Sequence, residues 1–277
     1  MGGLRKFGRG VFAASVILIA TVGGVAYAQS PKAATASPAA AGTPPSIEPG
    51  VLDELNKMGA YLRSQNMFTL QVDGTIDEVL LSGQKIQFGG KLIYKYRKPD
   101  GLFLSMDTDR QQRQFFFDGK TFTMYAPRMH FYASNEAPAT VKELIHDLDT
   151  KYGIELPIAD LFLWGTDAAN VAAIKSGIDV GPARINGTVC EHFAFRQENV
   201  DWQVWIQQGD KPLPRKLVIT TTDDDAKPQY VATLSWDTAT KVPESVFSFT
   251  PPKDVHRIRF APSEATAAAI EEPGHVQ

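Results

Sequence analysis

Between residues 48 and 261, the spacing of apolar residues changes from helical to alternating, back to helical, and to alternating again. Apolar residues three and four apart over 51–62 predict an amphipathic helix that opens the folded part of the chain. A second stripe of this kind over 141–152 predicts another helix, and Gly153 is well placed to end it. The segment 157–164 is apolar on every side and ends in Leu161, Phe162, Leu163 and Trp164.

Most of the remaining segments alternate apolar and polar residues, which is the pattern of half-buried β-strands. Asp118 and Gly119 have the composition of a tight hairpin turn between two of these strands. The pattern predicts roughly eleven strands in consecutive hairpins, together with two or three helices. The expected strand segments lie at 68–72, 85–97, 102–106, 114–117, 121–125, 128–133, 173–180, 187–196, 201–207, 215–222, 229–236 and 246–249.

Consecutive strands joined by short turns pair antiparallel, and a sheet of this many strands must curl rather than lie flat. A curved sheet has a concave apolar side that needs a second layer, for which the helices are the only candidates. We therefore predict a mainly antiparallel α+β fold, in the form of a strongly curved half-barrel with a helical lid. We expect residues 161–164 to form part of that lid.

The chain begins with a pattern typical of an export signal. Basic residues within the first nine positions precede an apolar stretch over 11–25, and small residues stand at Ala26 and Ala28. This predicts a signal peptide over 1–28 that is cleaved after Ala28, and a periplasmic location. The alternative is a retained membrane anchor, although the stretch has about 15 apolar residues where a spanning helix needs about 20.

Two segments are too poor in large apolar residues to bury a core, and we expect both to be disordered. They are an Ala/Pro-rich linker over 29–47 and a tail over 262–277, so the folded domain should span 48–261. The single cysteine, Cys190, leaves no lipid-attachment cysteine after the signal and no internal disulfide. The mature chain is therefore expected to be soluble and stabilised by its core alone.

Charge and motif content exclude several classes of function. The chain carries 28 basic and 31 acidic residues, a net charge of −3, and its basic residues form no sustained patch. Nucleic-acid binding is therefore not expected. The chain has no nucleophile elbow, phosphate loop or H-E-x-x-H motif, and its scattered histidines lack metal-ligand spacing: His130, His146, His192, His256 and His275. We predict no enzyme, no cofactor and no metal site.

Two residue groups have both a chemical and a structural interpretation. Cys190 and His192 are two apart on an expected strand, so they share a face on which the histidine could activate a thiolate. The alternative, which we favour, is a buried cysteine beside a polar neighbour. The acidic run at 223–225 could contribute to a Ca²⁺ site, but the absence of spaced ligands favours a solvated hairpin tip.

The segment 202–252 contains a strand, a Gly and Pro turn, further strands and the closing residues Phe247, Phe249, Pro251 and Pro252. This order of elements resembles the periplasmic lipoprotein carriers of the LolA type. A closer resemblance, over about 49–260, is to a family of predicted periplasmic proteins of unknown function within that superfamily. The resemblance implies a half-closed antiparallel barrel with helices over an apolar cavity, in which some members carry acyl chains. It assigns no functional residue, because no short segment aligns well enough.

Aromatic residues are abundant, with 16 Phe, 8 Tyr and 4 Trp, and such residues line acyl-chain cavities as readily as they fill a core. We expect an exported binding protein that holds a lipid or an acylated lipoprotein between sheet and lid, with transient membrane contact. The alternative is an envelope interaction or sensor module with a solid core. The residues expected to line the cavity or lid are Phe88, Tyr94, Leu104, Phe116, Phe122, Leu144, Leu148, Leu161, Phe162, Trp164, Trp202 and Trp236.

Overall fold

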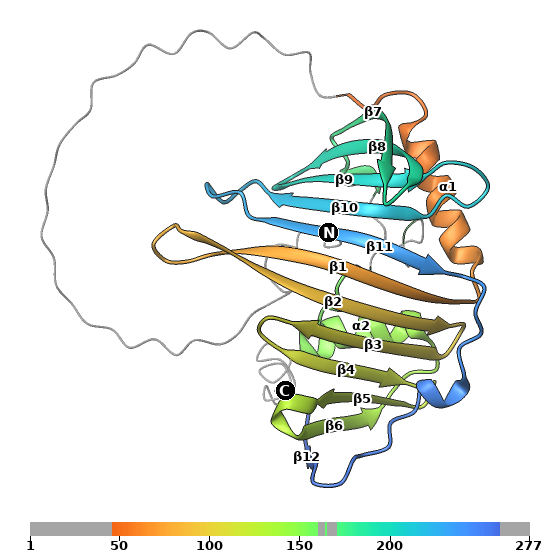
Figure 1. Ribbon diagram of the computed structural model, residues 1–277, viewed down its shortest axis with the longest axis vertical. Coiled ribbons are helices and arrows are strands. Elements are labelled where there is room, and N and C mark those ends of the chain that lie inside the picture. Colours follow the sequence, from red (N-terminus) through yellow and green to blue (C-terminus); the bar gives the residue numbers. More distant parts are fainter. Residues whose placement is uncertain (1–45, 160–163, 165–170, 261–277) are drawn as a thin grey trace, which may run out of the picture.

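The computed structural model describes residues 46–159, 164 and 171–260, which form one strongly curved sheet with two α-helices against its inner, concave face (Figure 1). The predicted signal peptide, almost all of the linker, the tail, and Leu161 and Phe162 lie outside the described residues. Helix α1 spans Val51–Ser64 and helix α2 spans Val141–Tyr152. Short 3-10 turns occupy Pro127–Met129 (η1), Val171–Ala173 (η2) and Glu244–Val246 (η3).

The sheet has twelve strands in the order β12-β6-β5-β4-β3-β2-β1-β11-β10-β9-β8-β7. Their bounds are β1 Met67–Val79, β2 Lys85–Arg97, β3 Gly101–Thr108, β4 Gln112–Phe117, β5 Thr121–Ala126, β6 Phe131–Glu136, β7 Ser176–Ile185, β8 Thr188–Gln197, β9 Val200–Gln207, β10 Pro214–Thr221, β11 Gln229–Asp237 and β12 His256–Ile258.

Two meanders, β1–β6 and β7–β11, make up the sheet and meet where β1 pairs antiparallel with β11. At this junction Leu70 lies opposite Trp236. The two ends of the sheet do not pair with each other, so the predicted curved, mainly antiparallel half-barrel is confirmed. The connection from β6 to β7 runs through α2, so the strands do not form one uninterrupted series of hairpins.

Both predicted helices are confirmed, and local sequence signals explain their ends. The hydroxyl of Thr140 accepts a hydrogen bond from the backbone N–H of Glu143 at 3.3 Å, which caps the start of α2. Gly153 ends α2 with a φ of 64°, a conformation that costs glycine little. The apolar stripe of α1 is buried in the core through Val51, Leu55, Met58 and Leu62.

The prediction of a last strand over 246–249 is wrong. After η3 the chain instead crosses the end and the outer, convex face of the sheet, anchored by two aromatic rings. Phe247 is buried so close to Gly101 that a Cβ at that glycine would lie 3.1 Å from the ring. Phe249 packs on the outer face, with its ring centroid 5.1 Å from that of Phe116. The alternation at these positions therefore reflects two separate anchors rather than pleated pairing.

The last strand is β12, which pairs parallel with β6 and covers that edge of the sheet. Beyond it, Phe260 reaches the inner face, where its ring lies 5.8 Å from that of Phe122 and 5.4 Å from that of Tyr152. We call residues 247–260 the edge strap. It passes from the outer face, around the β6 edge, to the inner face.

One large apolar cluster lies between the inner face and the helices and joins both meanders. Its largest fully buried side chains include Phe68, Tyr94, Leu104 and Phe117. A small second cluster lies on the outer face at the other end of the sheet and is formed by Cys190, Trp205 and Val218. The core therefore holds the helices on the concave side, as predicted.

Candidate functional site

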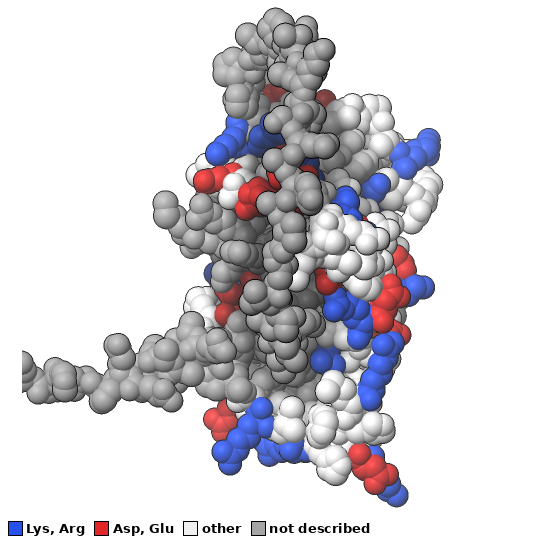
Figure 2. Space-filling view, turned by 90° about the vertical axis from the view of Figure 1, so that its left-hand side faces the viewer, with Lys and Arg blue, Asp and Glu red and all other residues white. Residues whose placement is uncertain are grey.

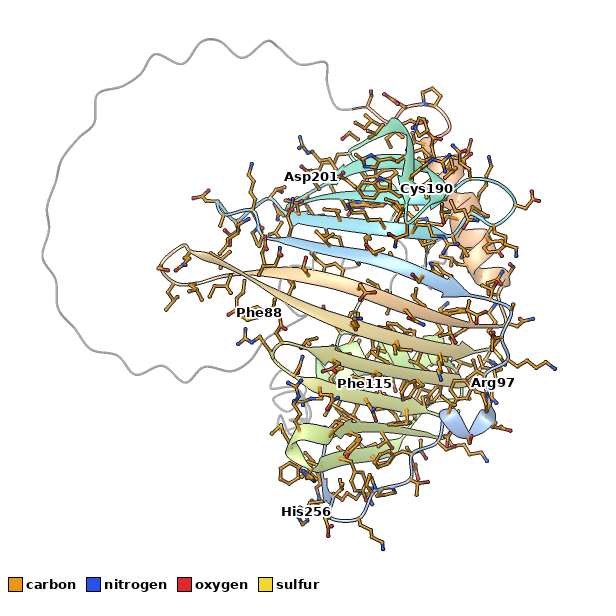
Figure 3. All side chains as sticks on the ribbon, in the orientation of Figure 1. Phe88, Arg97, Phe115, Cys190, Asp201 and His256 are labelled. Atoms are coloured by element: carbon orange, nitrogen blue, oxygen red, sulfur yellow. The ribbon has the colours of Figure 1, made fainter. Side chains whose placement is uncertain are left out.

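Strand register aligns inner-face side chains in a row across five neighbouring strands and the end of β8. Each residue of the row lies directly opposite the next in the paired strands. Figure 3 shows Phe88 on the side from which the β1–β2 hairpin projects and Arg97 at the opposite end of β2. The row therefore follows the hairpin side of the sheet. We call it the aromatic row, and it consists of Phe195, Trp202, Ile219, Tyr230, Ile76 and Phe88.

The adjacent inner-face row lacks large side chains at its centre, where Ala232, Gly74 and Gly90 lie opposite one another. A Cβ at Gly90 would lie 2.6 Å from Cγ2 of Thr108, which is closer than real side chains approach. Glycine inside a strand often marks a close approach of another group to the backbone. We call these three residues the glycine row, and two of them, Gly74 and Gly90, lie in the floor of a groove beside the aromatic row.

The groove has an apolar lining and a small volume. Its cavity volume is about 20 Å³, whereas ligand pockets typically have roughly 300–1,000 Å³. The groove therefore has no room for a ligand in this conformation. Besides the glycines, its lining includes Ile76, Phe88, Leu92, Met106, Pro157 and Tyr230.

A buried turn over residues 156–159, which we call the lid turn, closes the groove from above. The Tyr94 hydroxyl donates a hydrogen bond to the backbone carbonyl of Pro157. Burial raises the pKa of Tyr94 well above its usual value, so this hydroxyl is a neutral donor. Ile158 is fully buried and has a φ of 54°, a left-handed conformation that costs a β-branched residue about 1–2 kcal/mol.

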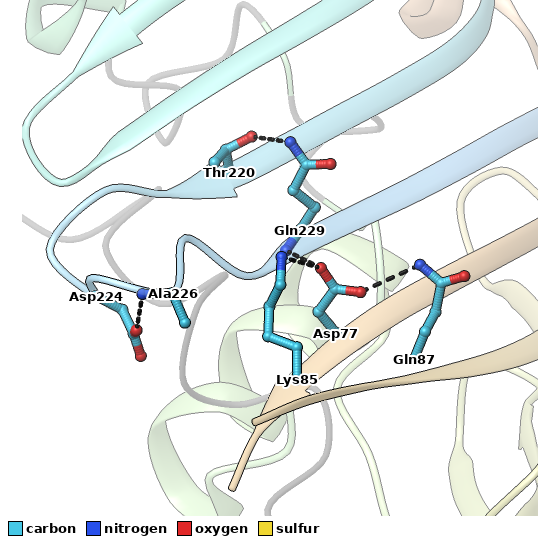
Figure 4. A network of polar contacts seen from close by, with 7 residues as sticks. All are labelled: Asp77, Lys85, Gln87, Thr220, Asp224, Ala226 and Gln229. Atoms are coloured by element: carbon cyan, nitrogen blue, oxygen red, sulfur yellow. Dashed lines mark hydrogen bonds and ion pairs between the residues drawn. The ribbon is translucent and has the colours of Figure 1, made fainter. Parts of the chain in front are cut away.

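A polar network stabilises the hairpin side of the sheet next to the groove (Figure 4). The Asp77 carboxylate accepts hydrogen bonds from Lys85 Nζ at 3.2 Å, Gln87 Nε2 at 3.1 Å and the backbone N–H of Gln229 at 3.2 Å. Partial burial acts to raise the pKa of Asp77, but these hydrogen bonds outweigh it, and the pKa lies below its usual value. The network ties β1 to β2 and β11.

The mouth of the groove carries a cation beside an aromatic ring. The guanidinium carbon of Arg110 lies 4.9 Å from the ring centroid of Phe88, and Arg110 also forms an ion pair with Glu78. The arginine charge is therefore already matched by a carboxylate. Figure 2 shows one side of the molecule, where acidic and basic residues of the described chain are interspersed.

Four buried donors on or beside the inner face have no hydrogen-bond partner in the described part of the chain. They are the indole N–H groups of Trp164 and Trp202, the side-chain amide of Gln197 and the hydroxyl of Tyr230. Trp164 and Trp202 have ring centroids 5.5 Å apart, and Phe195 stacks on Trp202 at 4.1 Å. Buried donors without partners are rare in folded proteins, so these four make this half of the interior a candidate binding site.

The sequence-predicted cavity residues fall into different places. Tyr94, Leu104, Phe122, Leu144, Leu148, Trp164 and Trp202 are buried in the core cluster. Phe88 and Trp236 are partly buried, and the Trp236 indole donates to the carbonyl of Pro214 at 2.7 Å. Phe116 lies on the outer face against Phe103 and Phe249. Leu161 and Phe162 lie outside the described residues.

Sequence reasoning missed the residues that shape the groove itself, namely Gly74, Gly90, Pro157 and Tyr230. The consecutive glycines at 89 and 90 within a predicted strand were an available signal, because glycine weakens a strand unless something approaches it. The lining of a ligand cavity by the residues named from the sequence stays a prediction.

The structure describes the surroundings of the Cys190–His192 pair and of the acidic run at 223–225. Cys190 is fully buried, and burial raises the pKa of its thiol. His192 stacks on Trp205 with ring centroids 3.9 Å apart, and burial lowers its pKa. This favours the structural interpretation of the pair. Asp224 accepts a hydrogen bond from the backbone N–H of Ala226 at 2.8 Å, as expected at a turn.

Within the described ranges, no cluster of three or more His, Cys, Asp or Glu side chains is arranged to hold a metal ion. Among the helices in the same ranges, none has the length and apolar character needed to span a membrane.

Several solved structures are similar to the chain at low identity. The lipoprotein LppX of Mycobacterium tuberculosis is 12% identical, with a TM-score of 0.42 over 71% of this chain and 100% of LppX. LprF of Mycobacterium bovis is 13% identical, with a TM-score of 0.35 over 72% of this chain and 98% of LprF. A LolA superfamily protein of Nitrosomonas europaea is 8% identical, with a TM-score of 0.31 over 72% of this chain and 97% of that one. At these scores the similarities carry no argument about function.

No curated protein matches the chain. A family model described as "Predicted periplasmic protein (DUF2092)" matches residues 53–261, which is most of the chain and nearly all of the described fold. The family expected from the sequence is therefore confirmed, and the chain belongs to the DUF2092 family of predicted periplasmic proteins.

Proposed function

We propose that this protein binds the acyl chain of a lipid or acylated protein between the aromatic row and the lid turn. The observation that carries the proposal is the strained, buried Ile158 in a turn that closes a groove whose floor lacks large side chains. Strain of this kind persists only where the surroundings enforce it, and it is typical of functional sites. The proposal gives the chain a binding role without catalysis.

The energetics allow an acyl chain to displace the lid turn. Each methylene group removed from water contributes about 0.8 kcal/mol, so a chain of about 16 carbons could supply on the order of 10 kcal/mol. Opening the turn breaks the hydrogen bond from Tyr94 to Pro157, which contributes about 1 kcal/mol net, and relieves the strain at Ile158. The balance favours binding if the ligand replaces the apolar contacts of the turn.

We also propose that the protein acts in the periplasm after cleavage of the signal peptide following Ala28. The description of the family as predicted periplasmic supports the compartment, and the basic, apolar and small-residue pattern at the start supports the cleavage. Intact mass measurement of the protein from a periplasmic extract checks the cleavage position.

The second candidate is an envelope interaction module with a solid core. It is favoured by the small volume of the groove, about 20 Å³, and by the continuous apolar cluster across both meanders. Under this alternative the lid turn does not open, and the protein binds a periplasmic partner protein on the outside of the fold.

The test compares two adjacent glycines that face opposite sides of β2. A methyl group at Gly90 enters the groove near Thr108, whereas at Gly89 the nearest atom is Asp109 Oδ2 at an ordinary 3.6 Å. Purified mature protein is titrated with a fluorescent fatty acid and analysed by native mass spectrometry. We expect Gly90→Ala to weaken binding by about tenfold, in line with an overpacking cost of about 1–3 kcal/mol, and Gly89→Ala to leave it unchanged.

Circular dichroism of both variants confirms that each is folded before the comparison is made. Wild-type protein that neither copurifies with lipid nor takes up the fatty acid contradicts the proposed function and supports the solid-core alternative. Equal weakening by both glycine variants contradicts the proposed course of the acyl chain, because only the methyl group at Gly90 would enter the groove near Thr108.

A further inference from the structure

The β7–β11 half of the interior holds three neighbouring donor groups that have no acceptor among the described residues. The Nε1 atoms of Trp164 and Trp202 and the Nε2 atom of Gln197 have no hydrogen-bond partner in the described part of the chain. Each of these residues is 5% exposed. We call them the donor cluster. Because native proteins satisfy nearly all buried polar groups, three orphan donors in one place require an explanation.

The donor cluster is built on fixed elements. Trp202 on β9 lies opposite Phe195 on β8, and Gln197 follows two residues later on the same face of β8. Gln197 is therefore the diagonal neighbour of Trp202 across the β8–β9 pair, and the Cα atoms of such neighbours are about 7–8 Å apart. Gln197 and Trp202 are therefore close neighbours on the inner face.

Helix α1 holds Trp164 in place beside these two residues. A Cβ at Gly59 would lie 2.7 Å from Trp164 Cδ1, so only glycine permits this approach of the indole to the helix. The guanidinium of Arg63, one turn later on α1, donates to the backbone carbonyl of Trp164. Both contacts fix Trp164 against Trp202 without supplying an acceptor to either indole.

All three members of the donor cluster are uncharged. Trp164, Trp202 and Phe195 place aromatic rings beside the two indole donors. A group that satisfies them needs lone pairs, needs no countercharge, and must tolerate an apolar surrounding. The carbonyl oxygen of an acyl group meets these requirements, because it accepts two hydrogen bonds and continues into a hydrocarbon chain.

The aromatic row connects the donor cluster to the groove. Trp202 is a member of the donor cluster and of the aromatic row. From Trp202 the row runs through Ile219, Tyr230 and Ile76 to Phe88, which lines the groove. Four strand spacings of about 4.8 Å separate Trp202 from Phe88, which gives roughly 19 Å. This is comparable to the extended length of a long fatty acyl chain. The unpaired hydroxyl of Tyr230 lies along the way.

We infer that the donor cluster binds the carbonyl end of an acyl chain whose hydrocarbon part follows the aromatic row to Phe88. This inference rests on the proposed function and adds the direction of the ligand and the group that is recognised. It also implies that the protein distinguishes acyl compounds from plain hydrocarbons.

The experiment removes one donor at a time while keeping an apolar side chain in place. Trp202→Phe, Trp164→Phe and Gln197→Met each delete a donor, and Trp205→Phe on the outer face is the matched control. Each full-length mature protein is titrated with methyl oleate, oleic acid and 1-octadecene, which present an ester carbonyl, a carboxyl group and no strong acceptor. Displacement of a fluorescent fatty acid reports the affinities.

We expect each donor variant to bind methyl oleate or oleic acid about 5- to 30-fold more weakly than wild type, and 1-octadecene within about twofold. Trp205→Phe should bind all three as wild type does. The acyl compound that loses more affinity identifies the source of the carbonyl, an ester or a free acid. Two other donor variants remain if one fails to fold.

Equal losses for acyl compounds and hydrocarbon would overturn the inference, because they assign the side chains a packing role alone. Unchanged affinities for all three ligands would overturn it as well, while leaving the proposed binding function intact. Absence of binding by the wild-type protein would overturn both, and this outcome is recognised before any variant is made.

Discussion

The two halves of the sheet each pack one helix on their inner face, but they treat buried polar groups differently. In the β1–β6 half, the Tyr94 hydroxyl donates to Pro157, and the Asn135 amide donates to the Tyr152 hydroxyl at 3.1 Å. In the β7–β11 half, Trp202 and Tyr230 leave their donors without partners among the described residues. The first half therefore has the satisfied interior of a scaffold, whereas the second contains the buried donors to which we assign ligand recognition.

The difference also appears on the outer faces. Aromatic rings of the β4–β6 region, Phe116, Tyr125 and Tyr132, pack around Phe249 of the edge strap, and Phe103 packs against Phe116. The scaffold half is thus held by aromatic contacts on both faces. The outer cluster of the other half is smaller and centres on Trp205, which lies between the His192 ring and the Lys216 ammonium group.

The largest expected effect tests the two-sided packing of the scaffold half. Phe117 is fully buried on the inner face, so Phe117→Ala should lower the free energy of unfolding by about 3–5 kcal/mol through lost burial and a cavity. Urea denaturation followed by circular dichroism measures the change. The neighbouring Phe116→Ala, on the outer face, is the matched control and should cost less than half as much. Equal costs would contradict the assignment of the two faces.

An intermediate effect compares the paired and unpaired tyrosines directly. Tyr94→Phe removes the donor that satisfies the Pro157 carbonyl and should lower the free energy of unfolding by about 1–2 kcal/mol. Tyr230→Phe removes a buried hydroxyl that has no partner among the described residues, so its effect should lie within about 0.5 kcal/mol or be stabilising. Thermal and urea unfolding of both variants provide the comparison. A loss at Tyr230 as large as that at Tyr94 would show that its hydroxyl is satisfied.

The smallest expected effect concerns the network at the junction of the halves. Asp77→Asn should lower the free energy of unfolding by about 1 kcal/mol or less at pH 7, since the hydrogen bonds lie near the surface. The pKa of Asp77 is lowered in the folded state, so its contribution is fully present above the unfolded value of about 3.9 and is lost as the pH falls through the folded-state value.

The difference in stability between wild type and Asp77→Asn should therefore be constant from pH 7 down to about pH 5 and decrease below about pH 4. Urea unfolding at a series of pH values measures it, with Asp73→Asn as a control, because Asp73 is well exposed and its ion pair with Lys91 has an N–O distance of 3.6 Å. A difference that grows on acidification would have the wrong sign and would refute the assigned network.

Local signals made much of the fold predictable. Apolar spacing and caps located both helices, since Thr140 and Gly153 act within a few residues of the ends that they define. The alternation of apolar and polar residues located most strands, because this pattern is also local to each strand. The run at 115–117 shows the limit: three consecutive phenylalanines do not reveal that Phe115 and Phe117 face inward and Phe116 outward.

Features that depend on register between distant segments could not be predicted. The aromatic row exists only because β1 pairs with β11 in one register, and a shift by one residue would place Tyr230 and Ile76 on opposite faces. The prediction of a strand over 246–249 is wrong because Phe247 and Phe249 alternate for reasons of tertiary contact. The residues proposed for binding lie in this non-local part, and the sequence-based prediction included Trp202 but not Tyr230.

The pairing of β1 with β11 also has a consequence for the order of folding. Residues as distant as Leu70 and Trp236 must meet before the middle of the sheet exists, and contacts of such long sequence separation form slowly. Until then, the completed β1–β6 meander exposes the bare backbone of β1 along one edge. A newly made chain therefore passes through a stage at which its own centre is the surface most prone to aggregation, and rapid arrival of β11 is what ends that exposure.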